Sequence, residues 1–290
     1  SKASPCLDPF QNRVYWIQDD QLYCFDLKSQ NRKIIVDLPS HWYTAFIHVS
    51  PDGNEACVPC TDPAAFPEGL ENQWDQMRAV TQRMAADSSL TSRIFRIHTA
   101  DSSMRVSAEL NFWVTHVQYD PLGSGKVVFN KEGFNCPPRI WCLEPTGETR
   151  PLANQPENTV WTHENWDPNG GRIVYHGLDE NSIAFLAART WEGELVVQKK
   201  MEHFKLGHVT ICLDGKRFIV DGIDGFVTLV EPDNGMRFTH LCKHDTDPSM
   251  KDQDAHVHAA IAPHGRSIVF TSDREGSCNV YEVFLAEATV

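Results

Sequence analysis

The chain of 290 residues has no run of about 18 apolar residues, the length that a helix needs to cross a membrane. We therefore expect no membrane-spanning helix and no membrane partner. The N-terminus also lacks the charged segment followed by an apolar segment that marks a signal peptide. A mature, processed chain would lack that pattern too, so this second absence does not exclude secretion.

Basic residues are scarce relative to acidic ones. Lysine and arginine number 26 against 39 aspartates and glutamates, which gives a net charge of -13. Such an acidic balance argues against broad nucleic-acid binding, because the phosphate backbone is repelled. Any anionic ligand must then be attracted by a local cation or by a bound metal ion.

The cysteines lack the spacing of a disulfide framework or a zinc site. There are nine, an odd number, at irregular intervals, and the pair Cys57 and Cys60 has no second Cys-x-x-Cys to complete four ligands. We therefore expect buried free thiols. Free thiols favour a reducing compartment, which indicates a cytoplasmic protein.

What the sequence does contain is a repeat. Four histidines each lie seven residues before a turn glycine, and these glycines are 47, 45 and 50 residues apart. The pairs are His116 and Gly123, His163 and Gly170, His208 and Gly215, and His258 and Gly265. One imidazole at the same point of every unit predicts a ring of histidines around an axis.

Each unit continues with a tight turn and an apolar, β-branched strand. In most of these turns proline presets the backbone, and glycine tolerates positive φ. The turns span 50–53, 120–123, 167–170, 213–216 and 262–265, and the strands after the last four span 126–129, 172–175, 217–220 and 267–270. Three or four strands per unit, at a period of about 40 to 50 residues, are typical of β-propeller blades.

We predict an all-β fold, a single β-propeller domain of six blades over residues 1–290. Strands over 14–17, 21–27 and 33–38 fit the first blade, but only about ten residues precede them. Its innermost strand must be improvised from 1–11 or be missing, so we expect the first blade to be incomplete.

One segment, 66–92, departs from the repeat. Trp74, Met77, Val80 and Met84 recur there at spacings of three to four, which predicts a helical insertion in a blade loop. The helix could cover a sheet edge or contribute to binding, and the first role is favoured.

A candidate metal site comes from the last two blades. His256 and His258 are two residues apart, so on one strand they point to the same face. Gln253 can add an amide oxygen, and His208 comes from the preceding blade. Nitrogen and oxygen ligands without thiolate suit a borderline divalent ion, with manganese, iron, nickel and zinc all open. A lone histidine beside a propeller channel is more often structural; the conjunction with His208 favours a metal site.

Several segments resemble the oligogalacturonate lyases, a family of manganese-dependent, seven-bladed β-propellers. Residues 160–170 are similar to the family's Thr-His-Glu-Phe-Trp segment, and 252–258 with 269–273 to its Gln-x-x-His-Pro-His stretch and the following strand. Residues 138–141 are similar to its arginine-containing strand. The last two blades carry the most specific match.

The resemblance implies a role for each matched position. His208, Gln253, His256 and His258 would hold a divalent metal, with Mn²⁺ favoured. His163 would be the catalytic base and Arg139 would assist it. The family cleaves short galacturonate oligomers by β-elimination and leaves a 4,5-unsaturated uronate, so the expected partner is a small acidic oligosaccharide. His116, at the same ring position as His163 one blade earlier, is a substrate-binding candidate for which a structural role is equally open.

These residue types suit the reaction. The C5 proton of a uronate is weakly acidic because its removal places charge beside a carboxylate, and a metal or a guanidinium on that carboxylate lowers the cost. A neutral histidine can then take the proton near neutral pH.

The chain also departs from the family pattern. Val257 and Ala259 replace the prolines of His-Pro-His-Pro, and the family chains are longer at the N-terminus by about one blade. Two alternatives stay open: a lyase acting on another uronic-acid oligosaccharide, and a non-enzymatic sugar-binding or interaction propeller. The presence of both His163 and Arg139 favours catalysis.

Overall fold

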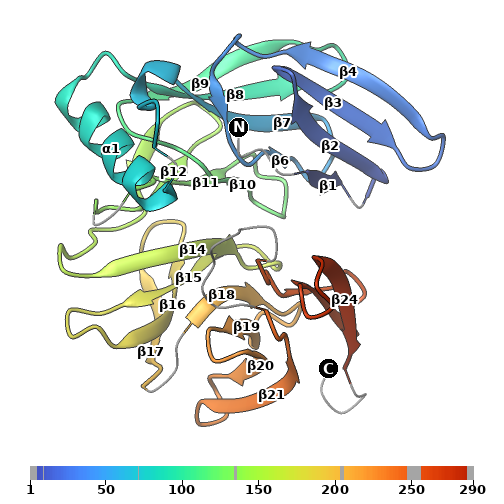
Figure 1. The fold of residues 1–290 in the computed structure, drawn as a ribbon, viewed down its shortest axis with the longest axis vertical. Coiled ribbons are helices and arrows are strands. Elements are labelled where there is room, and N and C mark those ends of the chain that lie inside the picture. The colour runs from blue at the N-terminus through green and yellow to red at the C-terminus, as the bar shows by residue number, and fades with distance from the viewer. Residues whose placement is uncertain are drawn as a thin grey trace. The chain divides into compact units, whose positions relative to one another are not determined.

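The computed structural model describes residues 5–8, 10–70, 72–133, 136–202, 206–246 and 256–285, which form six antiparallel sheets. This confirms the prediction of a six-bladed, all-β propeller. The chain divides into two compact units, Ser1–Glu157 and Asn158–Val290, and each contains three of the sheets (Figure 1). Whether the whole chain behaves as one domain stays a prediction.

Unit 1 holds the first three sheets. The first contains β1 (Cys6–Asp8), β2 (Arg13–Gln18), β3 (Gln21–Asp26) and β4 (Asn31–Asp37). Its innermost strand is present, because β1 is the strand improvised from the first eleven residues. The second contains β5 (Tyr43–Thr44), β6 (His48–Val49), β7 (Glu55–Thr61), β8 (Ser92–His98) and β9 (Met104–Leu110), and the third β10 (Val117–Tyr119), β11 (Val127–Asn130), β12 (Ile140–Leu143) and β13 (Thr149–Pro151).

Unit 2 holds the other three sheets. They comprise β14 (Val160–Trp166), β15 (Arg172–Leu178), β16 (Ala184–Thr190) and β17 (Leu195–Lys200); β18 (Leu206–Ile211), β19 (Phe218–Gly222), β20 (Phe226–Glu231) and β21 (Arg237–Lys243); and β22 (Ala260–Ile261), β23 (Ser267–Ser272) and β24 (Asn279–Phe284). Each is a simple meander in which neighbours in sequence pair. The innermost strands β14 and β18 carry His163 and His208.

The predicted turns connect β6 to β7, β10 to β11, β14 to β15, β18 to β19 and β22 to β23. Gly53, Gly123, Gly170, Gly215 and Gly265 all have φ between 67° and 77°. In each turn the glycine N–H donates to the carbonyl three residues earlier, for example Gly170 to Asp167 at 2.8 Å. These closed turns leave each histidine seven residues before its turn glycine, within a strand at His163 and His208 and ahead of the strand at His116 and His258.

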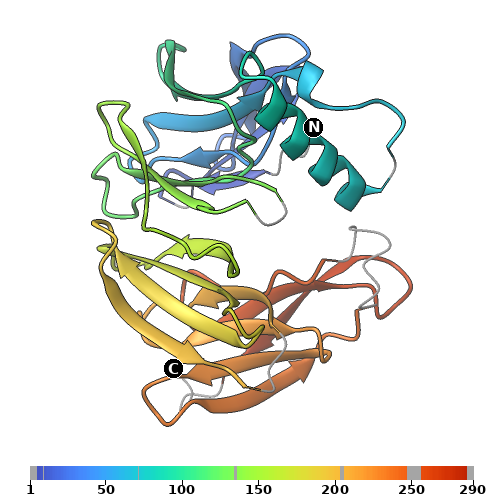
Figure 2. The same cartoon turned by 90° about the vertical axis from the view of Figure 1, so that its left-hand side faces the viewer.

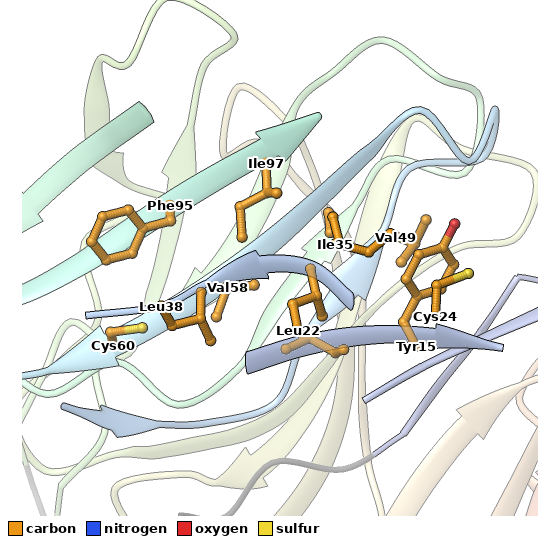
Figure 3. Packing of buried hydrophobic residues seen from close by; sticks show 12 residues of the cluster. Tyr15, Leu22, Cys24, Ile35, Leu38, Val49, Val58, Cys60, Phe95 and Ile97 are labelled. Atoms are coloured by element: carbon orange, nitrogen blue, oxygen red, sulfur yellow. The ribbon is translucent and has the colours of Figure 1, made fainter. Parts of the chain in front are cut away.

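Apolar side chains fill the space between neighbouring sheets of each unit. In unit 1, Tyr15 and Leu22 of the first sheet pack against Val58 and Ile97 of the second (Figure 3). In unit 2, Val174 and other side chains of one sheet pack against the next in the same way. Full burial of one such side chain contributes about 1.5 to 3 kcal/mol, so the face-to-face packing holds the inner strands in place.

The predicted helical insertion is confirmed. A 3-10 turn, η1 (Pro63–Ala65), precedes helix α1 (Gln73–Ala86), which is seen clearly in Figure 2. Asn72 caps the helix by accepting from the N–H groups of Trp74 and Asp75. Val80 and Met84 pack with Phe66 and Trp113 in a small separate core. The helix therefore buries Val80 and Met84 within unit 1, whereas Trp74 of the predicted stripe is 45% exposed.

All nine cysteines lie among the described residues and are free thiols, five of them buried. Among the described helices, none is long and apolar enough to cross a membrane. The free thiols agree with the prediction from composition.

Candidate metal centre

Three histidines of unit 2 lie together. One ring nitrogen each of His208, His256 and His258 can be chosen so that all three lie within 4.8 Å of one another. The ring centroid of His208 is 4.3 Å from that of His256 and 3.8 Å from that of His258. The centroids of His256 and His258 are 4.4 Å apart. Three of the four predicted ligands thus converge. The fourth, Gln253, lies outside the described residues.

The backbone achieves this convergence differently from the prediction. His256 and His258 precede β22 rather than lying within a strand, so simple alternation does not align them. Instead, His258 adopts a left-handed conformation with φ of 43°. His208 lies where the register between β18 and β19 shifts, between the pairs Leu206–Gly222 and Val209–Val220. Such bulges and left-handed residues re-aim side chains and occur often at functional sites.

A buried carboxylate orients His208. Nδ1 of His208 lies 3.0 Å from Oδ2 and 3.2 Å from Oδ1 of Asp221, and the backbone N–H of His208 donates to Oδ1. Burial alone would raise the pKa of Asp221, but the hydrogen bonds and charge of His208 outweigh burial and lower it. The N–H of Ala259 also donates to Oδ2, at 3.4 Å. One carboxylate therefore contacts both histidine-bearing segments.

The donor set fits a divalent ion. Burial, followed by the charge of His208, lowers the pKa of His256, which favours the neutral imidazole that a metal requires. The group that comes together contains three imidazoles and no thiolate, a set that suits manganese, iron, nickel or zinc.

His163 lies beside this trio. Its ring centroid is 4.4 Å from that of His208, and its Nδ1 is 2.7 Å from Nε2 of His176, a buried residue of β15. His163 has φ of 51° at a bulge between Thr162 and Asn165 of β14. The side chain of Asn165 donates to the carbonyl of His163 at 3.0 Å and so supports this backbone shape.

The other two predicted residues, His116 and Arg139, lie in unit 1, where Glu132 links them. A guanidinium nitrogen of Arg139 is 3.1 Å from Oε1 of Glu132, and both side chains are nearly buried, at 13% and 11% exposed. Burial alone would raise the pKa of Glu132. The charges of Arg139 and His116 and the hydrogen bond from Thr115 outweigh the effect of burial, and they lower this pKa to about 2. The ring of His116 stacks on Phe46 at 4.6 Å.

Sequence reasoning missed a second row of polar residues. Asn130, His176, Asp221 and Thr271 lie on the second strand of four sheets, and each hydrogen-bonds to a histidine of the innermost segment. Three of them lie six residues after a turn glycine, within a strand that is otherwise mostly apolar. A polar residue at a fixed distance from that glycine was the signal that could have found them.

No family model matches the chain. It is 21% identical over 304 aligned positions to the oligogalacturonide lyase of Pectobacterium atrosepticum, covering 95% of this chain and 75% of that protein. It is 23% identical over 211 positions to the oligogalacturonate lyase of Dickeya dadantii, covering 65% of this chain and 54% of that protein. The second alignment thus spans only about half of the curated relative.

Solved structures show similarity to the same group of proteins. An oligogalacturonate lyase in complex with manganese superposes with a TM-score of 0.84 at 20% identity, covering 98% of this chain and 77% of the other. The oligogalacturonate lyase of Vibrio parahaemolyticus gives 0.83 at 18% identity with the same coverage. The β-propeller domain of Swd1 from Myceliophteria thermophila, at 11% identity and 98% of this chain, gives 0.62.

The fold and site define a six-bladed β-propeller with a three-histidine cluster near its last two blades. Sequence and fold together confirm the expected resemblance: the chain is similar to proteins that are oligogalacturonate lyases.

Proposed function

We propose that the protein is a metal-dependent lyase that cleaves short galacturonate oligomers by β-elimination and leaves a 4,5-unsaturated uronate. One observation carries the proposal: a trio of histidines suited to a divalent ion converges in a chain whose curated relatives are oligogalacturonate lyases. The acidic chain has no general attraction for a polyanion, so a bound cation at this trio would supply it locally.

His208, His256 and His258 would hold the ion, and Gln253 is the proposed fourth ligand. We propose Mn²⁺, because a structure similar to this chain is an oligogalacturonate lyase in complex with manganese. When bound, the ion would polarise the substrate carboxylate and lower the cost of the charge that develops at C5.

His163 is the proposed base. If its Nδ1–H donates to Nε2 of His176, Nε2 of His163 keeps its lone pair and faces away from that hydrogen bond. His163 would accept the C5 proton at this atom. The C5–H electron pair would form the C4–C5 double bond, and the C4–O bond would break with its electron pair on the leaving oxygen, which would take a proton from water. The ring centroids of His163 and His208 are 4.4 Å apart, which supports a base close to the proposed ion.

Arg139 and His116 are the proposed substrate-side residues of unit 1. Glu132 contacts the guanidinium of Arg139 at 3.1 Å, and the backbone N–H of Arg139 donates to the side-chain oxygen of Gln155 at 2.9 Å, so both ends of the residue are held. A fixed guanidinium suits bidentate binding of a carboxylate. We propose that Arg139 assists catalysis by binding substrate charge and that His116 binds a substrate oxygen.

The test is to mix Mn²⁺-loaded protein with digalacturonate and follow the ultraviolet absorbance of the unsaturated product, with an EDTA-treated sample as control. A rise that chelation abolishes is expected. No rise from protein that demonstrably holds metal would reject digalacturonate as substrate, and other uronate oligomers would be assayed next.

The free thiols support a reducing location, and we propose the cytoplasm.

A further inference from the structure

Asp221 is the penultimate residue of the otherwise apolar strand β19 and is only 4% exposed. Its carboxylate accepts from the backbone N–H groups of His208 and Ala259 and lies 3.0 Å from Nδ1 of His208. Ala259 directly follows His258, so the carboxylate lies between the two segments that carry the histidine trio. A buried charge is retained only when such hydrogen bonds compensate for its lost hydration.

The chemistry of this contact settles which nitrogen of His208 carries the proton. An ionised carboxylate only accepts hydrogen bonds, so Nδ1 of His208 must donate to it. In the neutral imidazole the lone pair then resides on Nε2, the form that can bind a metal. The same contact with a neutral amide nitrogen would favour the opposite tautomer.

The residue before His208 is a glycine, which leaves room for the carboxylate of Asp221. A Cβ at Gly207 would collide with the backbone oxygen and the carboxylate of Asp221. Gly207 also lies within the register shift between β18 and β19, which gives Asp221 access to the N–H of His208. A glycine at this point is therefore required by the approach of Asp221.

From these contacts we infer that Asp221 is a positioning residue of the metal centre: it fixes the tautomer and orientation of His208 and, through the N–H of Ala259, the backbone after His258. The inference rests on the proposed metal site. A hydrogen-bonded carboxylate behind a metal-binding histidine makes the ligand more basic, and its loss typically weakens metal affinity about 10- to 100-fold.

The experiment compares Mn²⁺ affinity, read from the electron paramagnetic resonance signal of free Mn²⁺, between the wild type and Asp221→Asn. The new amide oxygen can still accept from the N–H of His208, but its nitrogen cannot accept from Nδ1. We expect affinity to fall by about 10- to 100-fold. The matched control is Asp179→Asn, the same change at another buried carboxylate of unit 2, which pairs with Lys200 at 3.0 Å. Its Mn²⁺ affinity should equal that of the wild type.

The outcomes separate the inference from the proposed function. A wild type that binds no Mn²⁺ refutes the proposed metal site itself. A wild type that binds, together with an equal affinity in Asp221→Asn, overturns the inference alone. If Asp221→Asn does not fold, long-range ¹⁵N–¹H spectra of the metal-free wild type decide: protonated Nδ1 on His208 supports the inference, and protonated Nε2 with bare Nδ1 overturns it.

Discussion

His116 and His208 occupy the same position in two blades, one in each unit, but their Nδ1 atoms meet different partners. His208 meets the carboxylate of Asp221. His116 meets the side-chain nitrogen of Asn130 at 3.1 Å, and the oxygen of that amide is occupied by the N–H groups of Thr115 and His116. Asn130 therefore donates, which leaves the proton of a neutral His116 on Nε2.

One scaffold position can therefore perform two kinds of chemistry. A histidine backed by an acceptor presents a lone pair, which can bind a metal or take a proton. A histidine backed by a donor presents an N–H, which can bind an oxygen of a ligand. The residue on the second strand, and not the histidine itself, decides between these functions.

The largest expected effect is at His163. His163→Ala should lower turnover by about 10²- to 10⁴-fold, the contribution of a general base, and leave Mn²⁺ content unchanged. Steady-state rates and elemental analysis check both parts. His240→Ala, at a histidine of β21 that bonds Thr228, is the control and should stay active. Retained turnover in His163→Ala would remove this residue from the role of base.

His256→Ala separates ligand from base within unit 2. Because a directly bound imidazole is lost, we expect Mn²⁺ affinity to fall beyond the roughly 100-fold that can follow loss of a supporting residue, and activity to fall with it. Raising the Mn²⁺ concentration should restore part of the activity of this variant but none of that of His163→Ala. Unchanged metal stoichiometry would exclude His256 from the ligand set.

How far the sequence predicts this site depends on the kind of interaction. The histidine–glycine spacing predicts the blades and which histidines share a level, because turn closure is local chemistry. The register shift at His163 and the left-handed His258 were not predictable, since they depend on cross-strand pairing and on tertiary packing. Asp221 lies six residues after Gly215, a spacing visible in the sequence, but its contact with His208 was not predictable because that partner is thirteen residues away across a bulge.

A pH experiment tests the charged pair of unit 1. The pKa of Glu132 in the folded state is lowered from 4.5 to about 2, so its contribution to stability is present above pH 4.5 and is lost as pH falls toward about 2. That contribution amounts to roughly 3 kcal/mol.

Urea unfolding of metal-free wild type and Glu132→Gln at about pH 7 and about pH 3 measures the effect. The stability gap between the two proteins should be smaller at the lower pH. A gap that does not change with pH would contradict the assignment of an ionised, paired Glu132.

The smallest expected effect is at His116, and it tests whether this residue differs in function from His208. If His116 binds substrate through Nε2–H, His116→Ala loses one hydrogen bond of about 0.5 to 1.5 kcal/mol, which raises KM by roughly tenfold at most. His116→Gln can place an amide N–H near the former Nε2 and should recover much of this loss. Mn²⁺ affinity should be unchanged in both variants. Equal KM values for wild type and His116→Ala would assign His116 to packing on Phe46. The hydrogen bond from Asn130 would then give His116 no binding function to compare with that of His208.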